Sequence, residues 1–309
     1  MAIQYDVPAP AKINLFLHVT GRRDDGYHLL QTAFRFIGLY DYLDFDIRSD
    51  GLIRREGDGL AGLAMDDDLV VRAARALQRA TGCRYGAQIR YRKTIPAGGG
   101  LGGGSSNAAS TLIALNRLWG TRLTRSELQA LGATLGSDVP VFIYGESAFA
   151  QGTGDDFQPL PLPEASYLLI QPRASVSTAA VFSAPNLTRN SKPITITFFT
   201  DWQRGAVAGK AGHEPAYFGR NDLEPVVLEL DAGVRATAMW LAQQDIKARM
   251  TGAGACFFVE YASPEQAAVQ QQKIIGKITQ CQGIVPAVIK QTWVCPGLHE
   301  HPLKYWIRS

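Results

Sequence analysis

Alternation of apolar and polar residues predicts two strands in the first hundred residues. Residues 13–19 alternate in the manner of a half-exposed strand, and residues 88–93 do so again. Between these stretches, apolar residues recur at helical spacing from Leu69 to Ala80. The aspartates at 66–68 precede them, where negative charge favours the positive end of a helix dipole. We therefore predict a helix between two strands.

Two more helices and a strand are predicted before residue 145. Residues 105–119 are rich in Ala and Leu and stop at Gly120, which is typical of a helix entered directly from a glycine-rich loop. Thr124 and Glu127 have the spacing of a capping box, so another helix should begin there and end at Gly136. The apolar run 139–144 then predicts a short buried strand.

The prolines at 159, 161 and 163 mark the best boundary within the chain. They interrupt regular structure, and a chain of 309 residues suggests about two domains. We expect an N-terminal domain over residues 1–157 and a C-terminal domain over residues 158–309. In the second part, strands are predicted at 167–171, 194–199 and 256–261, helices after Pro225 and from Ser263, and a loop at 205–219. Both halves are mixed, so the predicted fold class is α+β.

Composition and charge narrow the class of protein. The chain is 46% hydrophobic and 19% charged, with a net charge of only +3, which is typical of a packed chain and not of a disordered one. The basic residues are scattered, which gives weak support for a nucleic-acid partner and fits an anionic small substrate equally well. No apolar run approaches the roughly 18 to 20 residues needed to span a bilayer, so we expect a cytoplasmic protein.

The four cysteines show no close pairing, and a chain with a large core does not need disulfides. We expect them to be reduced. A set of possible zinc ligands consists of Cys281, Cys295, His299 and His301, but its spacing fits none of the zinc patterns.

The densest chemical signal is the glycine-rich loop at residues 96–106. It holds six glycines between a predicted strand and a predicted helix. Bare backbone N–H groups at a helix N-terminus favour an anion such as phosphate, so the loop predicts a phosphate cradle. The lack of a Lys between Lys93 and the helix excludes a Walker A loop, and the acidic residue of a dinucleotide site is missing about 20 positions on. The signature elements of a protein kinase are also absent.

The loop resembles the second motif of the GHMP small-molecule kinases. Residues 10–15 resemble the first motif of that family and residues 250–256 its third, so the resemblance extends over nearly the whole chain. Residues 26–28 and 135–142 make it closest to the members that act on 4-diphosphocytidyl-2-C-methyl-D-erythritol. The resemblance implies a two-domain α+β fold with an active-site cleft between the domains. It also implies ATP and Mg²⁺ as cofactors, and phosphorylation of the substrate 2-hydroxyl in the non-mevalonate isoprenoid pathway.

The resemblance assigns the reacting groups. Asp138 lies in a turn between Gly136 and Pro140, and the matching Asp is the catalytic base of the family. Lys12 would steady the substrate hydroxyl or phosphate, and Asn14 should share its strand face and help to bind the substrate. Each has a plainer interpretation, because Asp138 could be a helix cap and Lys12 a solvated strand-edge residue.

The resemblance also assigns both ends of the site. The matching residues Tyr27, His28, Phe34 and Phe182 would recognise the cytidine ring by stacking and hydrogen bonding. The expected ATP-binding residues are Leu69, Lys93, Pro96, Ala97, Gly98, Gly99, Gly100, Leu101, Gly102, Gly103, Gly104, Ser105 and Ser106. We expect Asn where this chain has Asp68, which puts an amide contact to the nucleotide in doubt. The Mg²⁺ ligands stay open between Ser106 and Asp138.

Other functions are compatible with parts of these patterns. A GHMP kinase for homoserine or mevalonate would share the fold, but residues 26–28 argue against it. A nucleotide sensor without activity would not need Lys12 and Asp138, and an RNA-binding module would not have its basic residues scattered. No nucleic-acid or membrane partner is expected, and the protein should be a monomer or a weak homodimer.

Overall fold

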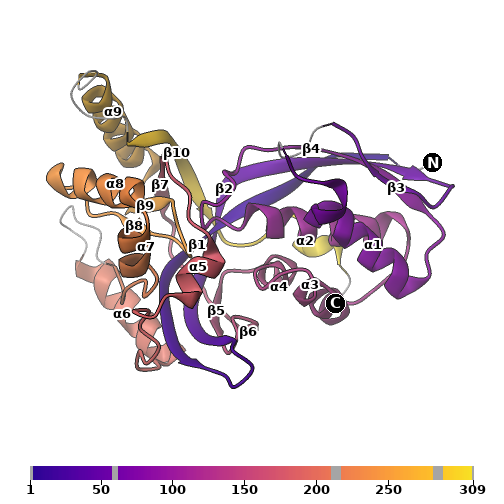
Figure 1. Ribbon diagram of the computed structural model, residues 1–309, viewed down its shortest axis with the longest axis horizontal. Coiled ribbons are helices and arrows are strands. Elements are labelled where there is room, and N and C mark those ends of the chain that lie inside the picture. Colours follow the sequence, from indigo (N-terminus) through magenta and orange to yellow (C-terminus); the bar gives the residue numbers. More distant parts are fainter. Residues whose placement is uncertain (1–2, 58–61, 210–216, 281–287, 308–309) are drawn as a thin grey trace.

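The computed structural model describes residues 3–57, 62–209, 217–280 and 288–307 (Figure 1). Its strands are β1 (Ile3–Arg22), β2 (His28–Arg48), β3 (Ile53–Arg55), β4 (Gly86–Arg92), β5 (Ala148–Gln151), β6 (Asp156–Pro159), β7 (Ser166–Pro172), β8 (Arg249–Met250), β9 (Phe257–Tyr261) and β10 (Ile289–Leu298). Its α-helices are α1 (Leu69–Thr81), α2 (Gly103–Leu118), α3 (Arg125–Ala133), α4 (Val139–Tyr144), α5 (Thr178–Ser183), α6 (Ile196–Gly209), α7 (Glu224–Leu230), α8 (Ala232–Gln243) and α9 (Pro264–Gln280). Two 3₁₀ turns are η1 (Met65–Asp67) and η2 (Lys304–Trp306).

The two longest strands, β1 and β2, form an antiparallel pair that reaches from one half of the molecule to the other (Figure 1). In their register Lys12 lies opposite Phe36, and Asn14 lies opposite Phe34. The predicted strand at 13–19 is confirmed as part of β1, but it is not half-exposed, because only Leu15 and His18 of this stretch are partly exposed. Helices and loops cover both faces of the pair here, which alternation in the sequence does not reveal.

A single sheet runs through both halves, in the order β3-β4-β2-β10-β7-β9-β8. Strand β2 pairs with β5 near its start, with β10 at Phe36 and Ile37, and with β4 at its end. Strand β10 therefore joins the first half of the chain to the second (Figure 1). Beyond β10 the chain returns to the first half, where Leu303 and Ile307 pack into its core.

The hydrophobic core has separate parts in the two halves, and a smaller part lies between them. One cluster packs α1 and α2 against β2 and β4, and another packs α7, α8 and α9 against β7 and β9. The cluster between them contains Ala11, Leu101 and Cys256, one from each of the three sequence motifs. Packing between the halves thus holds the motifs together. The domain boundary at residues 157/158 stays a prediction.

Most of the predicted elements are confirmed. Asp68 begins α1 as its N-cap, the helix at 105–119 is α2, and Thr124 and Glu127 form the capping box of α3. Strands β4, β7 and β9 and the helix after Ser263 also lie where they were predicted. The helical stretch after Pro225 is divided at Asp231, which ends α7 and caps α8.

Two predicted strands are wrong. Residues 139–144 form α4, and Pro140 in its first turn fits a helix start. The prediction failed because a short apolar run does not distinguish a strand from a buried helix. Residues 196–199 form the first turn of α6, where the Thr195 hydroxyl accepts from the Phe198 amide at 3.1 Å and Phe199 packs in an aromatic cluster. The loop predicted at 205–219 is helical up to residue 209, and residues 210–216 lie outside the described part.

Cys83, Cys256 and Cys295 are free, and Cys281 lies outside the described residues. Burial raises the pKa of Cys256 and of Cys295 to about 12, so both are thiols at neutral pH. Within the described ranges, no group of His, Cys, Asp and Glu is arranged to hold a metal ion. No helix there is long and apolar enough to cross a membrane.

Candidate active site

Backbone hydrogen bonds bring the three sequence motifs together around the glycine-rich loop. The Lys12 amide donates to the carbonyl of Leu101 at 3.0 Å, and the Ala255 amide donates to that of Gly98 at 3.0 Å. The Thr251 hydroxyl donates to the carbonyl of Gly100 at 3.3 Å. The loop is therefore fixed on one side by β1 and on the other by the turn before β9.

Two glycines of the loop are required by its shape. Gly100 has a φ of +71°, and a Cβ there would lie 2.1 Å from the carbonyl oxygen of Thr251. Gly102 has a φ of +70° and stands at the N-cap of α2, where no side chain caps the helix. The first N–H groups of α2 are thus left for a ligand, which suits an anion such as a phosphate.

Asp138 lies at the start of α4, but it does not cap that helix. Its side chain makes no cap hydrogen bond, and its Oδ2 lies 3.2 Å from Nζ of Lys12. About a third of the Asp138 side chain is exposed (34%), whereas that of Lys12 is almost covered (4%). The interpretation of Asp138 as a structural cap is therefore wrong, and its carboxylate faces both a buried cation and solvent.

Lys12 is held from several sides. Its Nζ donates to Oδ1 of Asn14 at 2.7 Å and lies 5.2 Å from the centre of the Phe34 ring. Asn14 is also held by two hydrogen bonds. Its Nδ2 donates to the Thr32 hydroxyl at 2.9 Å, and its backbone amide donates to the Thr251 hydroxyl at 3.0 Å. The interpretation of Lys12 as a solvated strand-edge residue is wrong. Thr32 was missed because it reaches this site only through strand pairing.

The two expected nucleotide-binding residues outside the loop, Leu69 and Lys93, lie beside its last glycines. Leu69 comes within 3.4 Å of the position that a Cβ on Gly104 would take. The Lys93 ammonium lies 3.3 Å from the corresponding position at Gly103 and pairs with the fully buried Asp41. Both side chains thus flank the start of α2, where a nucleotide phosphate would enter.

Asp68, which replaces the expected Asn, is fully used by the fold. Its Oδ1 accepts from the Val70 amide at 2.9 Å, and its Oδ2 accepts from Arg55 at 2.8 Å and from the Tyr91 hydroxyl at 2.6 Å. Burial and the hydrogen bond to Asp68 raise the pKa of Tyr91 to about 12. In this arrangement both carboxylate oxygens accept from protein donors, so Asp68 is not available to bind a nucleotide base.

The two serines at the start of α2 differ in their surroundings. Ser106 is fully buried, and its hydroxyl donates to the carbonyl of Pro10 at 2.6 Å. Ser105 is partly exposed, and its Oγ lies 3.9 Å from where a Cβ on Gly136 would be. Of the two candidate metal ligands, only Asp138 is thus accessible to a bound ion.

Three of the four expected base-binding residues, Tyr27, His28 and Phe182, lie on the β1–β2 hairpin and α5. The rings of His28 and Phe182 have their centres 5.1 Å apart, and Tyr27 is 66% exposed. Burial, followed by the charges of Arg189 and Arg22, lowers the pKa of His28. Phe34 lies six residues along β2, under Lys12, and no described contact joins it to His28 or Phe182.

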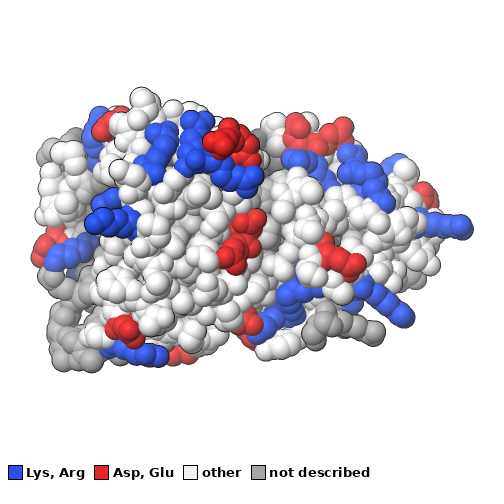
Figure 2. Space-filling model, turned by 90° about the horizontal axis from the view of Figure 1, so that it is seen from below, with Lys and Arg blue, Asp and Glu red and all other residues white. Residues whose placement is uncertain are grey.

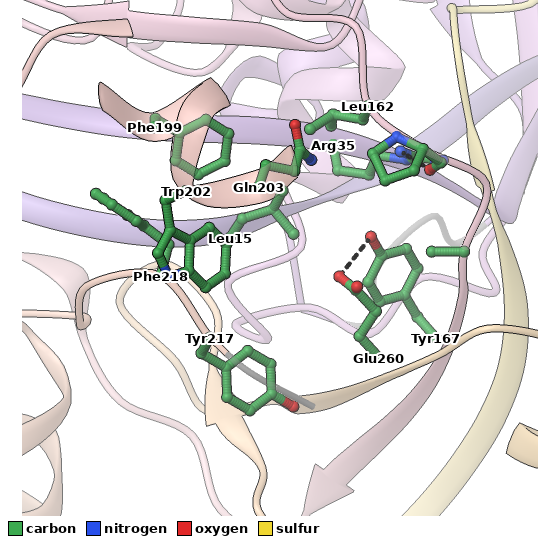
Figure 3. Close-up of a pocket in the computed structure, with 12 residues that line it drawn as sticks. Leu15, Arg35, Leu162, Tyr167, Phe199, Trp202, Gln203, Tyr217, Phe218 and Glu260 are labelled. Carbon is green, nitrogen blue, oxygen red and sulfur yellow. Dashed lines mark hydrogen bonds between the residues drawn. The ribbon is translucent and has the colours of Figure 1, made fainter. Parts of the chain in front are cut away.

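A small cavity lies apart from this site, between α6 and the strands β1, β2, β7 and β9 (Figure 3). Arg35 projects into its wall fully buried, with Nε and Nη2 lacking partners among the described residues, and the Tyr167 hydroxyl bonds Glu260 at 3.2 Å. Its volume of about 30 Å³ has room for water but not for a nucleotide. This cavity is therefore not the phosphate site.

On the face shown in Figure 2, basic and acidic side chains are interspersed, and neither sign covers a broad area. A phosphate backbone is bound through clustered Lys and Arg. This face thus gives no support to an RNA-binding function.

Known proteins match both the sequence and the structure. A family model described as the GHMP kinases N terminal domain matches residues 68–146. A protein of Bordetella parapertussis named 4-diphosphocytidyl-2-C-methyl-D-erythritol kinase is 53% identical over 99% of both chains. One of Azoarcus sp. (strain BH72) with the same name is 51% identical over 96% of this chain and 95% of its own.

Among solved structures, a 4-(cytidine 5'-diphospho)-2C-methyl-D-erythritol kinase superimposes with a TM-score of 0.73 at 30% identity, covering 96% of this chain and 99% of its own. A homoserine kinase from Cytophaga hutchinsonii superimposes with a TM-score of 0.62 at 18% identity, covering 96% and 95%. The second likeness concerns the fold alone.

Proposed function

Because the chain belongs to the 4-diphosphocytidyl-2-C-methyl-D-erythritol kinase family of the GHMP kinases, we propose that Lys12 and Asp138 carry out its reaction beside the glycine-rich loop. That reaction is the ATP-dependent phosphorylation of the 2-hydroxyl of 4-diphosphocytidyl-2-C-methyl-D-erythritol, which gives the 2-phosphate and ADP in the non-mevalonate isoprenoid pathway. The predicted fold class, the α+β fold of the GHMP kinases, is confirmed with it.

The observation that carries the proposal is the ion pair between Lys12 and Asp138 next to the uncapped start of α2. Phosphoryl transfer needs positioned phosphates, neutralised charge and a group that orients or deprotonates the attacking hydroxyl. The N–H groups of α2 and the loop would hold the phosphates of ATP. The Asp138 carboxylate would accept the hydroxyl proton as the oxygen bonds to the γ-phosphorus and the bond to the departing ADP oxygen breaks.

Lys12 would act on the Asp138 carboxylate and on the reacting groups of the substrates. Its ammonium faces the Asp138 carboxylate at 3.2 Å and is held by Asn14 at 2.7 Å, so its position is fixed before the substrate binds. A fixed cation at this point stabilises the negative charge that develops on the attacking oxygen and the transferred group. Asn14 would thus position Lys12 and contact the substrate hydroxyl.

Mg²⁺ fits this site as a companion of ATP. Protein sites often hold Mg²⁺ through one or two carboxylates, water and the substrate phosphates, and Asp138 is a partly exposed carboxylate beside the loop. Ser106 does not fit as a ligand, because its hydroxyl is buried on the Pro10 carbonyl. We propose that Asp138, directly or through water, is the protein group nearest the ion, which would neutralise the triphosphate charge.

The opposite end of the substrate would lie at the hairpin. Tyr27 and Phe182 offer exposed and partly exposed aromatic rings, and His28, whose ring lies 5.1 Å from that of Phe182, is a hydrogen-bonding group. Stacking on an aromatic side chain contributes about 1 to 3 kcal/mol per base. Phe34 would contact the substrate near Lys12, away from the base.

Replacing Asp138 by Asn tests the assignment of the base. The Asp138→Asn variant should lose about 10²- to 10⁴-fold in kcat, because an amide does not accept the hydroxyl proton. The Asp231→Asn variant is the matched control, since Asp231 also stands at a helix N-cap but accepts from Gly233 and Val234 instead. It should keep the wild-type kcat. If the Asp138→Asn variant turned over at more than about a tenth of the wild-type rate, Asp138 would not be the base.

A further inference from the structure

The side chain of Arg189 is anchored at the C-terminal end of α5. Its Nη2 donates to the carbonyl oxygens of Phe182 at 3.2 Å and Ala184 at 2.7 Å, and its Nη1 donates to that of Leu187 at 3.1 Å. The last carbonyls of a helix lack partners within the helix, and a cation there is favourable. The guanidinium group is therefore held in one orientation.

The remaining donor of this guanidinium faces the ring of His28. Nε of Arg189 donates to Nε2 of His28 at 3.1 Å. An arginine carries donors only and stays charged in proteins, so Nε2 has to be the acceptor. Burial and the two nearby arginines lower the pKa of His28, which makes the ring neutral at pH 7. A neutral imidazole that accepts at Nε2 carries its proton on Nδ1.

This Nδ1–H group is free to meet a ligand. Across the described ranges, no protein group accepts a hydrogen bond from Nδ1 of His28, and the ring is only partly buried. One face of the ring lies against Phe182, and the exposed Tyr27 precedes it in the chain. The hairpin thus presents a single fixed donor beside two aromatic rings, which suits the hydrogen-bonding edge of a flat base.

We infer that Arg189 is a positioning residue that makes this site select cytosine over uracil, by holding His28 as an Nδ1–H donor toward N3 of the base. The inference rests on the proposed base site at Tyr27 and His28. N3 of cytosine carries a lone pair and accepts this proton, whereas N3 of uracil carries a hydrogen and would face donor against donor. Without Arg189 the imidazole can exchange tautomers, and Nδ1 can then accept from uracil.

The tautomer of His28 can be measured directly by NMR. A long-range ¹H–¹⁵N spectrum of histidine-labelled protein reports which ring nitrogen carries the proton, and the His28→Ala variant identifies the signal. In the wild type we expect the proton on Nδ1, and in the Arg189→Met variant a mixture of tautomers. The Arg22→Met variant is the charge control, because Arg22 donates to the carbonyl of Gly26 and not to the ring. It should keep the proton on Nδ1.

Kinetics with the cytidyl substrate and its uridyl analogue test the consequence. We expect the wild type to prefer the cytidyl substrate by about a hundredfold or more in kcat/KM. The Arg189→Met variant should raise KM for it about three- to tenfold with little change in kcat, and should lose most of the preference. Arg235→Met is the matched structural control, since Arg235 donates to the carbonyl of Leu228 near the end of α7, away from the site. It should keep both.

A double-mutant cycle separates positioning from simple support of α5. If Arg189 acts through His28, Arg189→Met should change KM little further in the His28→Ala background. If Arg189 instead only supports Phe182, its effect on KM should add to that of His28→Ala. A wild-type proton on Nε2, or unchanged selectivity in Arg189→Met, would overturn the inference while leaving the base site in place. An unchanged KM in His28→Ala would instead remove the base site itself, and the inference with it.

Discussion

At the scale of single residues, Asp68 shows how the fold can occupy a side chain at a position where we expected Asn. Its two oxygens accept three hydrogen bonds, from Val70, Arg55 and Tyr91. The sequence predicted its place before a helix, and the structure adds that its carboxylate neutralises Arg55, whose side chain is 9% exposed. We therefore expect contacts to the nucleotide from neighbouring residues instead.

We predict that Asp68→Asn lowers the free energy of unfolding by about 3 to 5 kcal/mol, because it leaves Arg55 buried without its counter-charge. The KM for ATP should change by less than about threefold, which corresponds to under about 0.7 kcal/mol. The matched control is Asp66→Asn, where the carboxylate is 78% exposed and pairs with Arg75 at the surface. That variant should lose under about 1 kcal/mol in urea unfolding. Equal losses in the two variants would contradict this view of Asp68.

Local sequence predicts some site residues and not others. Lys12 and Asp138 lie within motifs, so the resemblance to the family indicated them, whereas their local sequence alone also fits a surface Lys and a helix cap. Arg189 meets His28 across 161 positions of sequence, and Thr251 meets Asn14 across 237. Such partners depend on the packing of the two halves and carry no local signal.

At the scale of elements, the glycine-rich loop depends on its contact with the turn before β9. A Cβ on Gly100 would lie 2.1 Å from the carbonyl oxygen of Thr251, whereas a Cβ on Gly120, which has a similar φ of +68°, would meet nothing within 4 Å. The two positions therefore share the cost of a left-handed backbone, but only Gly100 joins two motifs.

We predict that Gly100→Ala lowers kcat/KM by about a hundredfold, because the loop has to move away from Thr251 and misplaces the phosphates. Gly120→Ala should cost about 1 to 2 kcal/mol of stability from backbone strain and keep the wild-type kcat/KM. Steady-state kinetics and thermal unfolding of both variants distinguish these effects. If the two variants lost activity to the same extent, the contact with Thr251 would not matter for the loop.

Helices and strands were predicted correctly where a capping residue or a regular spacing of apolar residues marked them. The capping box of α3 and the N-cap of α1 are local, and they were found. Helix α4 was taken for a strand because five of its six residues are buried and the short apolar run shows no period. Helix α6 begins with an alternating stretch, which by itself favours a strand. The contacts of Phe199 with Phe16 and Phe218 in the aromatic cluster outweigh this preference for a strand.

At the scale of the whole molecule, the C-terminal segment fastens the second half to the first. After β10 the chain returns along α4, where the His301 amide donates to the carbonyl of Gly145 at 2.9 Å and Leu303 enters the core. The three motifs indicated from the sequence that distant segments would meet. The motifs do not predict that the C-terminal segment returns to the first half or that β10 joins the two halves.

His301 makes this attachment sensitive to acid. The side chain is 1% exposed, and burial, followed by the charge of Arg125, lowers its pKa to about 3 from 6.5. The unfolded chain therefore binds this proton more readily than the folded chain. The stability that neutral His301 provides is fully present above about pH 6.5 and is lost as pH falls toward 3, by about 1.4 kcal/mol per pH unit.

We predict that His301→Gln flattens the decline of unfolding free energy between pH 6.5 and 4.5, measured by urea unfolding at several pH values. His299→Gln is the control, because His299 is exposed and lies only two residues earlier. Its decline should stay steeper than that of His301→Gln. An unchanged slope in His301→Gln would mean that this histidine does not take up the proton on unfolding.

The most direct test of the account is ADP release by the purified protein with Mg-ATP, with 4-diphosphocytidyl-2-C-methyl-D-erythritol compared with mevalonate, homoserine, galactose and a blank without substrate. We predict turnover with the cytidyl substrate alone, because the base site at the hairpin and the pair of Lys12 and Asp138 would each hold one end of it. Equal or faster turnover with another alcohol would contradict the base site. Absence of turnover with every substrate, in protein that still binds ATP, would contradict catalysis at the Lys12–Asp138 pair.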